Sequence, residues 1–216
     1  MEKSQNAAKG KKSEEIENLK KAKVTEKLFS DHLNAQGIPY YYIDQSKESF
    51  SNFFKEKEIS RPDYIVYTAN GIFHVDVKYR AKQKITPNDT SFYLNQKNII
   101  KLNNFQTELH SFVWLAFTDN LEKPEFYYVS ITQLYDYYKF ISNEIEKYDI
   151  DIYNMAFNEQ CPIHIPKLML YYHLSFEKGF HNRPNMDYTE NDVRNHIDKA
   201  ITIAKINSYN NSYTYT

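Results

Sequence analysis

Two aspartates and a lysine within RPDYIVYTANGIFHVDVKYR, residues 61–80, are the side chains best suited to chemistry. Asp63 lies near the start of this stretch, and Asp76 and Lys78 lie two positions apart near its end. Neighbouring carboxylates form a hard-oxygen site for Mg²⁺, which takes few protein ligands and keeps several waters. The metal polarises a phosphoryl oxygen and lowers the pKa of a water, and an ammonium offsets transition-state charge. This combination indicates metal-dependent phosphodiester hydrolysis.

The residues around these side chains predict a β-hairpin. Two runs rich in β-branched and aromatic residues flank Asn70-Gly71, a pair suited to a two-residue turn. With that pair as the loop, we expect Asp63 directly opposite Lys78. Alternate side chains of a strand share a face, so Asp63 and Asp76 become diagonal neighbours with Cβ atoms within about 8 Å. The same residues also fit the solvated face of an edge hairpin, where an Asp–Lys pair needs no function.

The rest of the chain predicts an α/β (α+β) fold, because helical and strand patterns alternate along it. Up to residue 119 the expected order is helix, three strands, helix and strand. The expected elements are a helix over 13–36, strands over 38–44, 62–68 and 72–80, a basic loop over 81–91, a helix over 95–110 and a buried strand over 111–119. Beyond them we expect a strand over 125–131, a helix over 132–148, strands within 162–174 and a helix over 191–206.

In this order the chain resembles the PD-(D/E)XK nuclease superfamily, the restriction-endonuclease-like fold. The resemblance is carried by Pro62-Asp63 and, thirteen positions on, by Asp76-Val77-Lys78, and it spans roughly residues 15–120. It implies a central mixed sheet flanked by helices in the order α-β-β-β-α-β. It also implies that Asp63, Asp76 and the Val77 carbonyl are metal ligands and that Lys78 is the catalytic lysine.

Two further residues match supporting positions of the family. Glu26 on the first helix matches the helical carboxylate, where an inward-leaning acid reaches a metal-bound water, although Glu14, Glu15 and Glu17 compete for this position. Gln96 opens the next helix, where many members carry a Gln or Lys that contacts phosphate or water. It fits equally well as a surface amide near a helix start.

Basic residues follow the proposed centre closely in the sequence. The cluster consists of Lys78, Arg80, Lys82, Lys84, Lys97 and Lys101. On a chain of net charge -1, such a local concentration is where a phosphate backbone would approach. We therefore expect nucleic-acid contacts from Arg80, Lys82, Lys84, Gln96 and Lys97, with a solvated loop face as the alternative. The sequence carries no helix-turn-helix, zinc-finger or RRM signature.

Composition limits the other function classes. Cys161 is the single cysteine, so an intramolecular disulfide and a Cys-rich zinc site are excluded, which suits a reducing, cytoplasmic location. We see no secretory signal, and the most apolar run, residues 112–117, is too short to span a bilayer. Cys161, His164 and His173 make only a weak metal motif, because a fourth ligand is missing. The 20 tyrosines fit base stacking but also the composition of an AT-rich genome.

The sequence as a whole predicts one domain with a Mg²⁺- or Mn²⁺-dependent endodeoxyribonuclease activity. Its parts are a disordered basic tail (1–12), the nuclease core (13–120) and a C-terminal elaboration (121–216) for substrate grip or oligomerisation. DNA is the expected substrate and RNA a variant, with a homodimer or a partner subunit possible and no membrane. The resemblance suggests restriction, phage defence or mobile-element DNA processing. The alternatives are a catalytically inactive nucleic-acid- or protein-binding subunit of this fold, and a plain α/β interaction protein.

Overall fold

The computed structural model describes residues 2–68, 71–80, 83–86, 89–146 and 163–165. Cys161, His173, Lys82 and the helix expected over 191–206 lie outside these residues. In chain order the elements are α1 (Glu2–Ala35), β1 (Tyr40–Tyr42), α2 (Asn52–Glu56), β2 (Tyr64–Thr68), β3 (Gly71–Tyr79), β4 (Gln83–Thr86), β5 (Asp89–Leu94), α3 (Gln96–Glu108), β6 (Val113–Thr118), β7 (Tyr127–Ser130), α4 (Ile131–Glu146) and β8 (Ile163–Ile165).

Five of the strands form one mixed sheet in the order β1-β2-β3-β6-β7. Neighbours in this sheet are antiparallel, except that β3 and β6 run parallel. A parallel pair needs a crossover connection, usually helical, and α3 lies between these two strands in the sequence. The predicted α+β class and the order helix, three strands, helix, strand are therefore confirmed, as α1, β1, β2, β3, α3 and β6.

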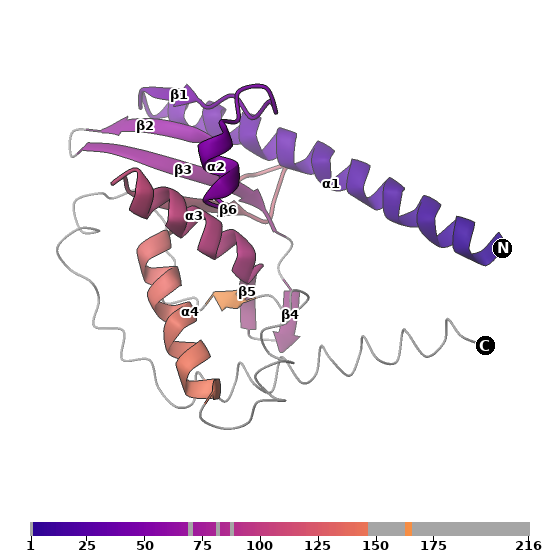
Figure 1. Cartoon of the computed structure of the whole chain (residues 1–216). Helices are drawn as coiled ribbons and strands as arrows, with labels where there is room; N and C mark the ends of the chain where they lie inside the picture. Colours follow the sequence, from indigo (N-terminus) through magenta and orange to yellow (C-terminus); the bar gives the residue numbers. More distant parts are fainter. Residues whose placement is uncertain (1, 69–70, 81–82, 87–88, 147–162, 166–216) are drawn as a thin grey trace.

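Helices cover both faces of this sheet (Figure 1). On one face Phe29 and Leu33 of α1 pack with Val75, Val77 and other residues of the strands. On the other face α3 and α4 build a second cluster with alternate residues of β6. All six residues of β6 are buried as a result, which explains why this strand is a continuous apolar run rather than an alternating pattern. The N-terminal part of α1 extends away from the sheet in Figure 1.

The β2–β3 hairpin forms, but its register differs from the predicted one by two residues. Thr68 pairs with Gly71 and Tyr64 with Val75, so Asp63 is not opposite Lys78 as expected. Extending the observed register by one residue places Asp63 opposite Asp76. Because a shift of two residues leaves every side chain on its original face, the two aspartates still share a face.

In the observed register Gly71 begins β3, with φ +137°, rather than serving as the second residue of the turn. An added Cβ would meet only Phe73 ring carbons, at 3.8 Å or more, so space is not limiting. We expect Gly71→Ala to lower the free energy of unfolding by about 1–3 kcal/mol through backbone strain alone. Chemical denaturation of this variant beside the exposed-site control Ile72→Val measures the effect, and equal stability of the two would contradict it.

Other segments differ from the sequence-based expectation. We expected a disordered tail over 1–12, whereas α1 begins at Glu2. The segment expected as a basic loop over 81–91 contains β4 and the first half of β5 instead, and these strands form a second sheet with β8 in the order β4-β5-β8. That sheet depends on pairing Phe92 with Ile165, a long-range contact that local sequence does not encode. Within the described ranges, no helix has the length and apolar character needed to cross a bilayer.

Candidate active site

Asp63 lies immediately before β2, and its carboxylate is held by the neighbouring strand. Its Oδ2 accepts a hydrogen bond from the Val77 N–H (2.7 Å), and its own N–H donates to the Val75 carbonyl (3.0 Å). These bonds fix both the backbone and the side chain against β3. Asp63 is only 7% exposed. The structure thus places Val77 beside Asp63 through its amide, while a role for its carbonyl as a ligand stays a prediction.

Asp76 and Lys78 form the second part of the site on β3. Lys78 Nζ lies 2.7 Å from Asp76 Oδ2, with the two side chains 25% and 5% exposed. They project from the same face of the strand because they are two residues apart. Burial lowers the pKa of Lys78, but the charges of Asp76 and Asp63 outweigh it and leave that pKa raised. Lys78 is therefore an ammonium at neutral pH, suited to electrostatic stabilisation and positioning rather than to general-base catalysis.

Asp76 lies close enough to Asp63 to perturb the titration of that residue. Burial, and next the charge of Asp76, raise the pKa of Asp63 to about 7, against the lowering effects of Lys78 and the Val77 N–H. Asp63 thus holds a proton in acidic solution and loses it near neutrality. A buried acid with such a pKa is typical of functional sites, since structural carboxylates are usually paired well enough to stay ionised.

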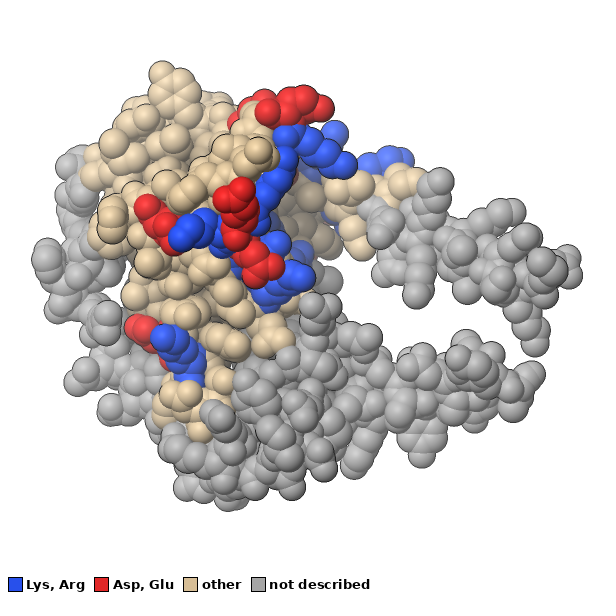
Figure 2. Space-filling model, in the orientation of Figure 1, with Lys and Arg blue, Asp and Glu red and all other residues tan. Residues whose placement is uncertain are grey.

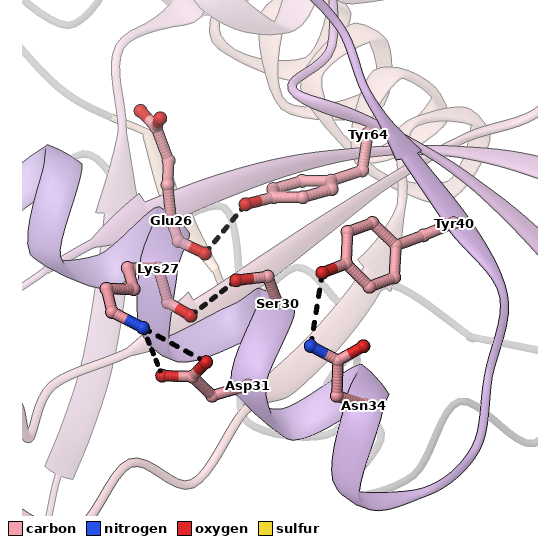
Figure 3. Close-up of polar contacts among 7 residues, drawn as sticks. All are labelled: Glu26, Lys27, Ser30, Asp31, Asn34, Tyr40 and Tyr64. Atoms are coloured by element: carbon pink, nitrogen blue, oxygen red, sulfur yellow. Dashed lines mark hydrogen bonds and ion pairs between the residues drawn. The ribbon is translucent and has the colours of Figure 1, made fainter.

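Glu26 lies on α1, the helix on which the resemblance places a supporting carboxylate. Its charge is one of the causes of the raised Asp63 pKa. The carboxylate accepts a hydrogen bond from the Tyr42 hydroxyl (3.0 Å to Oε2), and the backbone carbonyl accepts one from the Tyr64 hydroxyl (2.7 Å). Figure 3 shows the Glu26 carboxylate directed away from Lys27, which pairs with Asp31 instead. Sequence patterns do not distinguish Tyr42, because nothing in a run of three tyrosines marks the one that faces the helix. Tyr64 likewise reads only as one aromatic residue of a strand.

The donor set fits Mg²⁺ or Mn²⁺ better than a metal that needs several nitrogen or sulfur ligands. In the described part of the chain, no group of three or more His, Cys, Asp or Glu residues is arranged to hold a metal. Mg²⁺ needs only one or two carboxylates, however. Asp76 Oδ2 is buried and, apart from its ion pair with Lys78, receives no hydrogen bond from the described residues. The acids Asp63, Asp76 and Glu26 outnumber the bases Lys78 and Arg80 that interact with them, and a divalent cation would offset the difference.

The structure describes four of the five residues expected to contact nucleic acid, at the end of β3, in β4 and at the start of α3. Arg80 lies at the end of β3, where burial lowers its pKa and its guanidinium donates to the Tyr79 carbonyl (2.8 Å). Gln96 begins α3, and Asn95 caps that helix by accepting from the Lys97 N–H (2.8 Å). Lys84 belongs to β4 and pairs through its backbone with Thr90. Figure 2 shows acidic and basic side chains interspersed on the visible face rather than a patch of one sign.

Comparison with known proteins gives a limited likeness at the level of the fold. No protein-family model matches the chain, and no curated protein matches it. Among solved structures, the chain is similar to the Holliday junction resolvase Hjc of Archaeoglobus fulgidus, a hyperthermophilic archaeon. The TM-score is 0.39 at 12% sequence identity, over 67% of this chain and 88% of that one. The support for a function therefore comes from the side chains of this chain.

Proposed function

We propose that the protein is a metal-dependent nuclease that hydrolyses phosphodiester bonds in DNA. The observation that carries this proposal is the set of Asp63, Asp76 and Lys78, which meet at one end of the β2–β3 hairpin with both aspartates buried. Burial and the charge of Asp76 raise the pKa of Asp63. Such a pair of buried acids weakens the fold unless a cation neutralises it. Lys78 pairs with Asp76 and lowers the pKa of Asp63 without restoring its ordinary value, so a purely structural role would leave part of that cost uncompensated.

Each residue has a distinct role in this proposal. Asp63 and Asp76 hold the divalent cation, with the Val77 carbonyl as a further ligand and Glu26 as a supporting acid. The cation, when bound, polarises the scissile phosphate and makes water a better nucleophile. Lys78 orients the attacking water and stabilises the negative charge that develops on the phosphoryl oxygens.

Basic residues beside this centre are proposed to contact the phosphate backbone of the substrate. Arg80 continues the strand that carries Asp76 and Lys78, and Gln96 and Lys97 occupy the first turn of α3. We extend the same role to Lys82 and Lys84, which follow Arg80 in the sequence. Phosphate contacts of this kind set the register of a nucleic acid without reading its sequence. A role in restriction, phage defence or mobile-element DNA processing, in the cytoplasm, is compatible with such a centre.

Nicking of supercoiled plasmid tests the proposal directly. The purified protein is incubated with plasmid in Mg²⁺, in Mn²⁺ and in EDTA, with single-stranded DNA and RNA as parallel substrates. We expect metal-dependent conversion of the plasmid to nicked or linear forms. Asp76→Asn, purified identically, controls for contaminating nucleases, so equal cleavage by the variant would contradict the proposal. Preferential cleavage of RNA would change the substrate class and leave the centre in place.

A further inference from the structure

We propose that Tyr42 is a positioning residue that holds the Glu26 carboxylate toward Asp63 and thereby completes the acidic centre. This inference rests on the proposed function, because it concerns the same centre. It assigns a role to a residue of the edge strand β1, which is neither one of the paired aspartates nor the lysine. The Tyr42 hydroxyl acts through Glu26 and is not itself a catalytic group.

The geometry ties β1 to α1 at this point. Tyr42 donates its hydroxyl hydrogen to Glu26 Oε2 over 3.0 Å. Tyr42 also pairs with Tyr64 in the β1–β2 ladder, and the two rings pack edge to face with centroids 5.4 Å apart. Tyr64 thus holds Tyr42 in two ways, as its partner in the strand ladder and through the contact between the two rings. An aromatic side chain with only two χ angles, packed in this way, gives its hydroxyl a defined position.

Tyr64 fixes the backbone of the same glutamate. Its hydroxyl donates to the Glu26 carbonyl over 2.7 Å, and the residue is only 2% exposed. Because Tyr64 directly follows Asp63 in the chain, this bond connects the strand that bears Asp63 to the helix turn that bears Glu26. Tyr64 therefore places the glutamate backbone, which Figure 3 shows, and Tyr42 places its carboxylate.

Tyr42 remains a hydrogen-bond donor at all pH values relevant to the protein. Burial, then the hydrogen bond to Glu26, then the charges of Glu26, Asp63 and Asp44 raise the pKa of Tyr42 to about 12. A phenol that keeps its proton can act as the donor in the bond to Glu26 Oε2. The neighbouring tyrosines have other contacts, since Tyr40 accepts from the Asn34 amide and Tyr41 packs on the Tyr67 ring.

A double-mutant cycle of Tyr42→Phe and Glu26→Ala tests the role under single-turnover conditions with Mg²⁺, because Ala removes the acceptor of the Tyr42 hydroxyl whereas Gln would keep one. Loss of a group that orients a metal-site residue typically lowers activity 10–100-fold, so we expect Tyr42→Phe to slow cleavage by about 10-fold. In the Glu26→Ala background the same substitution should cause no further loss. Tyr41→Phe, which also removes one hydroxyl from β1, is the matched control and should stay within about twofold of wild type. Additive effects, or an equal loss in Tyr41→Phe, would overturn the inference.

Thermal unfolding of the same variants separates this inference from the proposed function. In EDTA, the melting temperatures should be non-additive for Tyr42→Phe and Glu26→Ala, because each substitution removes the same hydrogen bond. In Mn²⁺, the concentration that gives half-maximal stabilisation should rise in Tyr42→Phe and stay unchanged in Tyr41→Phe. Absence of coupling in EDTA would disprove the contact whether or not the protein cleaves DNA. Coupling in EDTA without cleavage or metal stabilisation by wild type would overturn both the nuclease function and the positioning role.

Discussion

Replacing either Asp76 or Lys78 is expected to lower the rate of phosphodiester cleavage by about 10³-fold. Loss of one preorganised electrostatic contact to the transition state typically reduces kcat by about 10²–10³-fold. Replacing Asp76 also lowers the affinity for the cation. Lys78 is 25% exposed and paired at 2.7 Å with Asp76, so its charge is fixed beside the proposed metal ligand. Single-turnover cleavage of a labelled duplex by Asp76→Asn and Lys78→Met measures the effect.

The variants must keep the protein folded, because breaking a buried ion pair can unfold a protein. Asn and Met preserve the size of the side chains, and circular dichroism with thermal unfolding establishes that each variant is folded. Asp31→Asn and Lys27→Met remove an exposed Asp–Lys pair on α1, with a nitrogen–oxygen distance of 3.0 Å, and should leave cleavage unchanged. A folded Asp76→Asn or Lys78→Met that retains more than about a tenth of wild-type activity would contradict the assigned roles, since losing such a contact costs about 10²-fold or more.

Asp63→Asn is expected to stabilise the metal-free protein at pH 8 by a few kcal/mol while abolishing its response to metal. The folded-state pKa of about 7 lies above the value near 3.9 of an unfolded aspartate. The stability that this difference contributes is fully present below about pH 4 and is lost as pH rises through 7. At pH 8 the ionised Asp63 thus opposes folding, and an uncharged isostere that still accepts from Val77 relieves the penalty.

Urea denaturation at pH 5 and pH 8, with EDTA and with Mn²⁺, measures this prediction. We expect a large difference between Asp63→Asn and wild type at pH 8 and a small one at pH 5. Mn²⁺ should stabilise wild type by mass action and leave the variant unaffected. Asp31→Asn, at an exposed position of α1, is the control without pH dependence. A variant that is no more stable than wild type at pH 8 would show that Asp63 is already neutralised within the fold.

Local sequence patterns determined most of the core and the composition of the site. The alternation of side chains along residues 72–80 placed Asp76 and Lys78 on one face, because that period is a property of any strand. Helical spacing identified Ile99, Leu102 and Phe105, which are all buried on α3. Leu109, expected on the same stripe, is 42% exposed because it is the C-cap of the helix.

Only the tertiary structure decided the features that depend on contacts between distant segments. The hairpin register moved by two residues from its predicted value, yet Asp63 and Asp76 remained on one face because side-chain direction repeats every two residues. The Tyr42–Glu26 bond joins residues 16 positions apart, and no local pattern distinguishes Tyr42 from its two tyrosine neighbours. Which tyrosine faces α1 is set by the pairing of β1 with β2. The sequence alone therefore supplied the chemical groups, whereas packing between helix and sheet determined their partners.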